Sequence, residues 1–163
     1  MFTLDQLSSV IGHRIYFNQL SPQVEIDRRI ADGDLEGLRP LMTPEKADKS
    51  MIIASMCKQG EIFDHLFETY RPKMETRGAC VAHFANFGDQ RRIERILDKG
   101  EIDEKSKNAA LGHAIREGHE SIVYRLTDLK ISKNALKESA EFAKELGKDN
   151  LASFLKNKSE DSI

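Results

Sequence analysis

Histidine is the residue type in this chain with the greatest capacity for metal binding or proton transfer. The five histidines are His13, His65, His83, His113 and His119. His83 and His113 each precede a glycine by five residues, at equivalent positions of two neighbouring repeats described below. Packed helices lie about 8–10 Å apart, whereas zinc binds an imidazole nitrogen at about 2.0–2.1 Å. Two such histidines do not share a zinc ion without further ligands, so the sequence predicts no metal site.

The two cysteines, Cys57 and Cys80, are the other candidates for chemistry. Neither lies in a CxxC spacing, and two thiols do not form a disulfide framework. Both are predicted to be small buried residues in a reducing compartment. No nucleophile elbow, phosphate-binding loop, HExxH motif or dinucleotide fingerprint occurs in the sequence. The sequence therefore predicts a protein that is not an enzyme, with no catalytic residue and no cofactor.

A cluster of arginines occurs at Arg91, Arg92 and Arg95, where acidic residues are interleaved. Such mixing is typical of a solvated helix face with weak ion pairs; contact with nucleic acid or with an acidic protein stays open as an alternative. The net charge of −2 gives no basic excess. A nucleic acid partner is therefore not expected, because phosphate neutralisation supplies much of such a protein's affinity.

The elements that position these residues follow from a repeat that is marked by glycines. The glycines with similar surroundings are Gly33, Gly60, Gly88, Gly118 and Gly147, which are separated by 27, 28, 30 and 29 residues. Apolar or small residues recur seven and four positions before the last four of them, and this spacing places both columns on one helix face. The two columns consist of Ile53, Val81, Leu111 and Ala140, and of Met56, Phe84, Ala114 and Ala143.

A second apolar pattern follows each glycine, so each repeat is predicted to be a helix, a turn at glycine and a second helix. Glycine adopts the left-handed conformation that commonly ends a helix. Asp34, Asp89 or Asp149, directly or shortly behind a glycine, can accept hydrogen bonds from the amides that open the second helix. One helix pair does not bury its apolar face alone, so the pairs are expected to stack around a shared core.

The repeat resembles the ankyrin repeat family. The segment that carries this resemblance runs from Ala114 to Val123, where Ala114, Gly118-His119 and Ile122-Val123 match the family pattern. The resemblance covers residues 26–157. It implies an all-α solenoid of about five stacked helix-turn-helix repeats; another helical solenoid or a non-repetitive helical domain stays open. The family's Thr-Pro-Leu-His opening is absent, and the repeats are shorter than the usual 33 or so residues, which predicts short loops with little or no β-structure.

The ends of the chain lie outside the repeat. Residues 1–25 are predicted to form an N-terminal helical cap on the solenoid; the alternative is a segment that binds a partner or a second copy of the chain. Residues 158–163 are predicted to be a disordered tail. The sequence shows no signal peptide and no apolar run that spans a membrane, so we expect a cytoplasmic protein.

The stacking that the resemblance implies places the first helices on a concave face. The residues expected to point outward and bind a partner are Ser55, Lys58, His83, Asn86, Phe87, His113, Arg116, Glu117, Phe142 and Glu145. His83, Phe87, His113 and Arg116 are predicted to form the centre, since aromatic residues and arginine often anchor interfaces. The expected function is protein–protein interaction. The alternatives are a small viral or bacterial effector that blocks one host enzyme or defence protein, and a nucleic-acid-binding solenoid.

Overall fold

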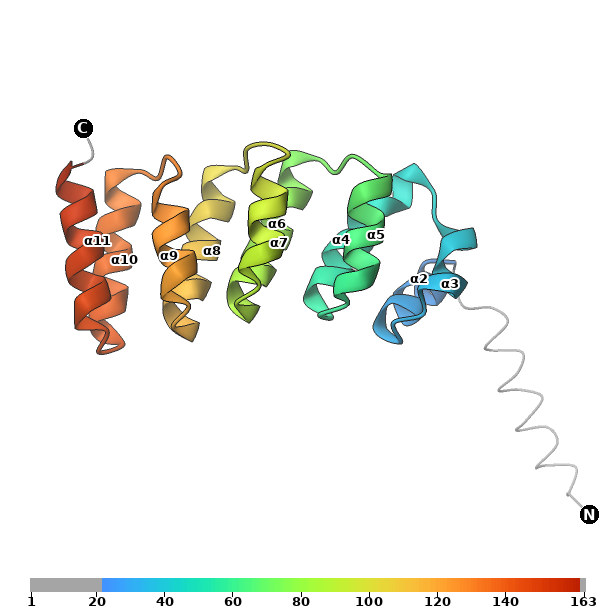
Figure 1. Cartoon of the computed structure of the whole chain (residues 1–163), viewed down its shortest axis with the longest axis horizontal. Helices are drawn as coiled ribbons and strands as arrows, with labels where there is room; N and C mark the ends of the chain where they lie inside the picture. The colour runs from blue at the N-terminus through green and yellow to red at the C-terminus, as the bar shows by residue number, and fades with distance from the viewer. Residues whose placement is uncertain (1–21, 162–163) are drawn as a thin grey trace, which may run out of the picture. The chain divides into compact units, whose positions relative to one another are not determined.

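The structure is a computed structural model that describes residues 22–161 of the chain. This part contains ten α-helices and one short 3₁₀ helix and no strand (Figure 1). The prediction of an all-α protein is confirmed. Contacts divide the chain into two compact units, with the division between Leu66 and Phe67. We call these the N-terminal unit and the C-terminal unit.

The N-terminal unit begins with a short and irregular helix pair. Its elements are α2 (Pro22–Ala31), α3 (Leu35–Leu38), η1 (Arg39–Leu41), α4 (Pro44–Met56) and the first part of α5 (Gly60–Thr69). Helix α2 packs against α3 and α4. Ile26, Ile30 and Leu38 are completely buried, so apolar residues spaced by one helical turn hold α2 in the unit.

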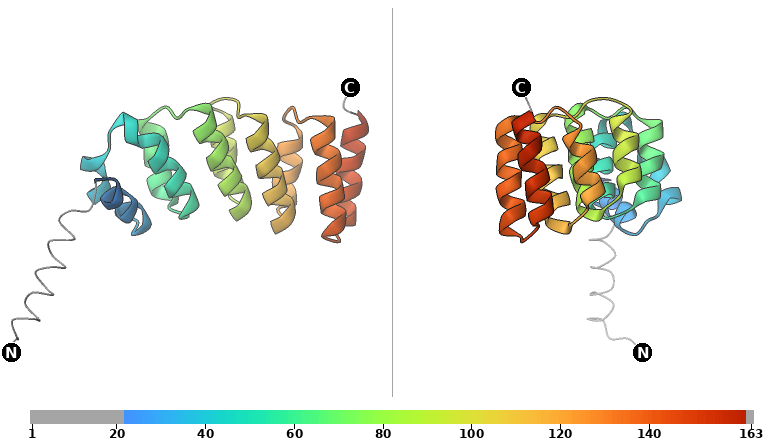
Figure 2. Two further views of the ribbon diagram at one scale, coloured as in Figure 1. Left: turned by 180° about the vertical axis from the view of Figure 1, so that it is seen from behind. Right: turned by 60° about the vertical axis from the view of Figure 1, so that its left-hand side comes forward.

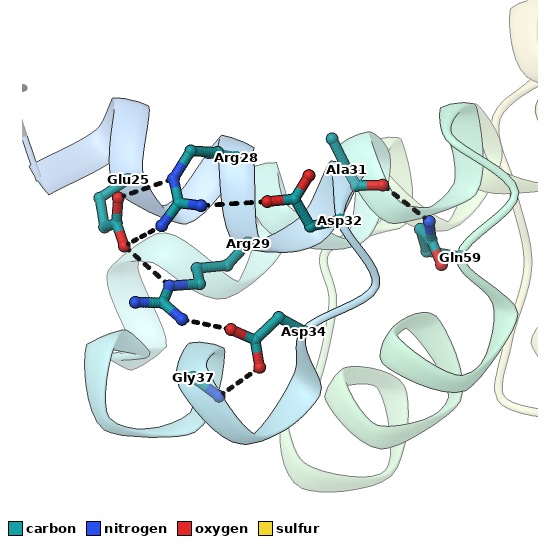
Figure 3. Close-up of polar contacts among 8 residues, drawn as sticks. All are labelled: Glu25, Arg28, Arg29, Ala31, Asp32, Asp34, Gly37 and Gln59. Carbon is teal, nitrogen blue, oxygen red and sulfur yellow. Dashed lines mark hydrogen bonds and ion pairs between the residues drawn. The ribbon is translucent and has the colours of Figure 1, made fainter.

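Charged side chains connect α2 to the turn that follows it (Figure 3). Glu25 accepts hydrogen bonds from Arg28 at 2.8 Å and from Arg29 at 2.7 Å. Arg29 also pairs with Asp34, and Asp34 accepts a hydrogen bond from the amide of Gly37 at 2.9 Å. Asp34 thereby caps α3, as the sequence predicts. The hydrogen bonds from Arg28 and then Arg29 lower the pKa of Glu25 to about 2.

The C-terminal unit is a row of helix hairpins. Within residues 67–161 the hairpins are α6 (Met74–Phe87) with α7 (Gln90–Leu97), α8 (Glu104–Glu117) with α9 (Glu120–Thr127), and α10 (Lys133–Glu145) with α11 (Asp149–Asp161). Each first helix contacts its own second helix; α8 also contacts both α6 and α10. The first helices therefore form one layer and the second helices another, as Figure 2 shows for this part of the chain.

The apolar columns of the repeat form the core of the C-terminal unit. Val81, Leu111 and Ala140 are buried, as are Phe84, Ala114 and Ala143 one turn later. Apolar residues of the second helices face them; these include Ile93, Ile96, Ile122, Leu126, Leu151 and Leu155. Each hairpin shares this core with its neighbours, as the repeat pattern predicts.

Four of the five predicted glycine positions are left-handed turn residues. The φ angles are +71° at Gly33, +77° at Gly88, +82° at Gly118 and +71° at Gly147. At Gly118 the chain reverses so tightly that the amide of His119 donates to the carbonyl of Ala114 at 2.9 Å. This bond satisfies a carbonyl that the end of α8 leaves free.

The remaining turn, between α4 and α5, lies two residues earlier in the sequence than predicted. Lys58, with φ +59°, is the left-handed residue, and Gly60 instead begins α5. Because the turn lies two residues earlier, Ser55 is buried and donates to the carbonyl of Ile52 at 2.7 Å. The prediction that Ser55 faces outward is therefore wrong. The outward positions are Ile53 and Met56 of α4 and Cys57 directly after the helix, and Cys57 is exposed rather than buried.

The described ends of the chain also differ from expectation. Helix α11 continues to Asp161, so residues 158–161 are helical rather than part of a disordered tail. Ser159 is buried there, and the amino group of Lys158 lies 3.6 Å from the carboxylate of Asp128 on the preceding hairpin. At the other end, residues 22–25 of the predicted cap belong to α2, and residues 1–21 lie outside the described residues. None of the helices within 22–161 combines the length and apolar character that a bilayer-spanning helix needs.

The left-handed Lys58 predicts a stabilising substitution. A residue with a Cβ is strained at positive φ, whereas glycine is not, so Lys58→Gly should be more stable than Lys58→Ala by about 0.5–1 kcal/mol. Thermal unfolding of the two variants measures this difference free of the lysine side chain's own contacts. Gly147→Ala is the matched control, because its new Cβ meets no atom within 4 Å. It should lower stability by a similar amount, and equal unfolding temperatures for all variants would contradict the left-handed turns.

The Glu25 network predicts acid-sensitive stability. A carboxylate whose folded pKa is lowered contributes stability above its unfolded value of 4.5, and this contribution is lost as pH falls towards about 2. Glu25→Gln should therefore unfold at a lower temperature than the wild type at pH 7, and the difference should shrink steadily below about pH 4.5. Glu61→Gln, at an exposed carboxylate on α5, is the control. A difference that does not depend on pH would exclude the arginine pairs as its cause.

Candidate partner-binding face

Eight of the ten predicted binding residues lie on the first helices of the C-terminal unit. Helix α6 contributes His83, Asn86 and Phe87, α8 contributes His113, Arg116 and Glu117, and α10 contributes Phe142 and Glu145. Arg116, Glu117 and Glu145 are exposed, and the other five are half-buried. We call these eight residues the first-helix face. Ser55 and Lys58 belong to the N-terminal unit, where Ser55 is buried and Lys58 is exposed.

Helix geometry explains why these positions avoid the core. Each first helix turns its core-facing side inward seven and four residues before the left-handed glycine, as at Leu111 and Ala114 in α8. Residues five, two and one before that glycine lie on the other side of the helix, because successive residues are rotated by about 100°. His113, Arg116 and Glu117 follow this rule in α8. The fixed distance from the turn therefore aligns equivalent residues on neighbouring helices.

Arg116 joins residues of two helices into one polar network. Its guanidinium donates to Oδ1 of Asn86 on α6 at 2.7 Å and to Oε1 of Glu117 at 2.8 Å. The Nη2 atom also lies 3.0 Å from Nδ1 of His113. Arginine is only a donor, so Nδ1 of His113 must be the acceptor and the ring proton lies on Nε2. The network thus holds a neutral imidazole beside an arginine.

Burial and nearby charges keep both histidines of the face neutral at pH 7. Partial burial lowers the pKa of His83, and the nearby His113 lowers it further. Burial also lowers the pKa of His113; Arg116 adds to this effect and Glu117 opposes it. The hydrogen bond from Arg116 lowers the pKa of Glu117. At neutral pH the exposed charges in this part of the face are therefore one arginine and one glutamate.

Two of the three arginines in the cluster on α7 are occupied by contacts within the chain, whereas Arg91 is exposed. Arg92 pairs with Asp89 at 2.5 Å, and its guanidinium carbon lies 5.9 Å from the centre of the Phe84 ring. Arg95 pairs with Glu68. The expected ion pairs are present, and some of them connect separate elements. A third such pair joins Glu94 of α7 to Arg125 of α9 at 2.8 Å.

The residue after the left-handed turn contacts the preceding hairpin at three of the five turns, a set of contacts that was not predicted from the sequence. Lys148 donates to the carbonyls of Ile115 and Arg116, at 2.5 and 3.0 Å, and so holds the turn of the preceding hairpin. His119 lies against Gly88, where an added Cβ would be 2.7 Å from Cε1 of the imidazole. His119 therefore packs against the turn of the preceding hairpin. The signal in the sequence is a long or ring-bearing side chain at these three positions, whereas Gly33 and Gly88 are each followed by an aspartate that caps the next helix.

Within the described residues, no three histidine, cysteine or acidic side chains lie close enough together to hold a metal ion. His83 and His113 approach each other closely enough to interact electrostatically, but no third ligand joins them. The chemistry available to the first-helix face is thus hydrogen bonding, ion pairing and contact with aromatic rings.

The network predicts opposite pKa changes for two variants. Arg116→Gln should raise the pKa of His113, because the neighbouring positive charge disappears, and Glu117→Gln should lower it. A histidine NMR titration of the folded protein measures both. Burial is the larger cause of the lowered pKa, so Arg116→Gln should leave it below 6.5. Identical titrations in all three proteins would mean that Arg116 and Glu117 do not contact His113 in solution.

Comparison with known proteins adds no relative from which a role can be transferred. No protein-family model, no curated protein and no solved structure matches the chain. The candidate site therefore stands on its own residues and geometry.

Proposed function

We propose that this protein binds a partner protein through the first-helix face. The observation that carries the proposal is the Arg116 network, in which residues of α6 and α8 are joined at the surface and leave Arg116 and Glu117 exposed. Arginine and aromatic side chains are enriched at the centres of protein interfaces. The half-buried rings of Phe87 and Phe142 belong to the same face and supply apolar contact area.

An ankyrin-like solenoid is our proposal for the architecture. It is supported by hairpins that reverse at left-handed residues, with separations of 30 and 29 residues along Gly88, Gly118 and Gly147. It is also supported by bonds between successive turns, such as those from Lys148 to the carbonyls of Ile115 and Arg116. Repeat proteins of this kind use the side chains of equivalent positions as an extended binding surface.

The chemistry of the face favours a partner that offers both a carboxylate and an apolar side chain. The guanidinium of Arg116 retains N–H groups that can pair with a carboxylate, and Asn86 holds it in position at 2.7 Å. A positioned arginine loses less conformational entropy on binding than a free one. A cytoplasmic location also remains a proposal; the free thiol of the exposed Cys57 is compatible with a reducing compartment.

The proposal is tested by replacing Phe87 and Arg116 together with alanine. Proteins captured from a lysate by the wild type should be identified and quantified by mass spectrometry. A true partner should be depleted by about tenfold or more on the variant, as expected when two interface anchors are removed. Far-UV circular dichroism should be unchanged, since neither side chain is part of the buried core.

The matched control replaces an arginine and an aromatic residue of the second helices, Arg91 and Tyr124, with alanine. Both are exposed, and the Tyr124 ring packs on Phe154 with a centroid distance of 4.7 Å. The control therefore also removes an aromatic contact from the fold. Partners retained by the control and lost by the Phe87/Arg116 variant support the first-helix face, whereas equal capture by both variants would reject it.

A further inference from the structure

A hollow of about 500 Å³ in the C-terminal unit is lined by positive charge from three segments. Arg71 lies in the loop after α5, Arg77 lies on α6, and Lys99 lies in the loop after α7. These loops join one hairpin to the next, at the opposite end of the helices from the glycine turns (Figure 1). No residue of the first-helix face lines the hollow, so it is a separate candidate site.

The positive charge of the hollow is not balanced by its own lining. The one carboxylate there, Glu68, is paired with Arg95, which does not line it. Within the described part of the chain Arg71 and Lys99 make no ion pair. Two cations therefore face the same space without a counter-charge, and this arrangement is stabilised when an anion enters it.

Arg77 is fixed in place between the two loops. Its Nη1 donates to the carbonyl of Pro72 and its Nη2 to the carbonyl of Glu101, both at 2.9 Å. Gly100, with φ +147°, permits this approach, because an added Cβ would lie 3.1 Å from Nη2. A guanidinium has five N–H groups. Two are used here and the one on Nε is buried without a partner, so each Nη atom keeps one N–H group for another acceptor.

We propose that this hollow binds a phosphate group carried on an organic molecule, a phosphomonoester dianion. Two unpaired cations and a positioned guanidinium match the double negative charge and the several acceptor oxygens of such a group. Phe67, Tyr70 and Pro72 also line the hollow and can contact the organic part. Its volume lies within the range of about 300–1,000 Å³ that small-molecule sites occupy.

The test is an NMR titration of the full-length ¹⁵N-labelled protein with phenyl phosphate. We expect saturable shifts of the amides of residues 70–72, 77 and 99–101. In Arg71→Gln/Lys99→Gln, affinity should fall by about tenfold or more, because two charge-assisted contacts are lost. The matched control is Arg91→Gln/Lys137→Gln, which removes the same charge from exposed positions outside the hollow and should bind like the wild type.

Two further ligands show whether the hollow recognises the charge of the phosphate group, the organic part, or both. Benzoate carries an equivalent ring with a single charge and should bind much more weakly. Inorganic phosphate should shift the same amides and compete with phenyl phosphate. If the two ligands bind with equal affinity, the phosphate group alone is recognised. If inorganic phosphate binds more weakly, the organic part contributes to binding. Absence of saturation, benzoate binding as tightly as phenyl phosphate, or equal affinity in both double variants would overturn the proposal.

Discussion

The reversal of the chain at a residue with positive φ is the constraint on which the hairpins depend. It ends the first helix, starts the second within two residues, and sets which side chains of the first helix point away from the core. At Gly118 it also satisfies a carbonyl at the end of α8 through the amide of His119. The neighbouring hairpin then holds the same turn, because Lys148 binds the carbonyls of Ile115 and Arg116. Backbone conformation thus determines both the stacking of hairpins and the position of Arg116 on the surface.

Much of this arrangement could be predicted from the sequence, because glycine marks a left-handed position directly. The helix ends at Gly33, Gly88, Gly118 and Gly147 were predicted from their spacing, and the buried columns followed from them. The turn at Lys58 was predicted two residues too late. A lysine gives no sign of positive φ, and the nearby Gly60 was taken as the turn residue instead. The error moved the outward positions by two residues, which is why Ser55 was expected at the surface.

The candidate face was predicted as a set of positions but not as a network. Helical periodicity places His113 and Arg116 on one side of α8, yet it does not show that Asn86, 30 residues earlier, binds the same guanidinium. That contact depends on the alignment of two helices. The hollow beside Arg77 was not predicted for a similar reason. Its walls are loops that lack any repeated pattern, and Arg77 reaches the carbonyl of Glu101 only because Gly100 leaves room for it.

Because one cysteine is exposed and the other is buried, their reactivities can report transient opening of the C-terminal unit. Cys57 is exposed on the N-terminal unit, whereas Cys80 is only 1% exposed inside the C-terminal unit. An alkylating reagent therefore modifies Cys57 in the native protein and reaches Cys80 only while α6 is transiently released from its neighbours. The ratio of the two alkylation rates measures how often the hairpin row opens, without any engineered label.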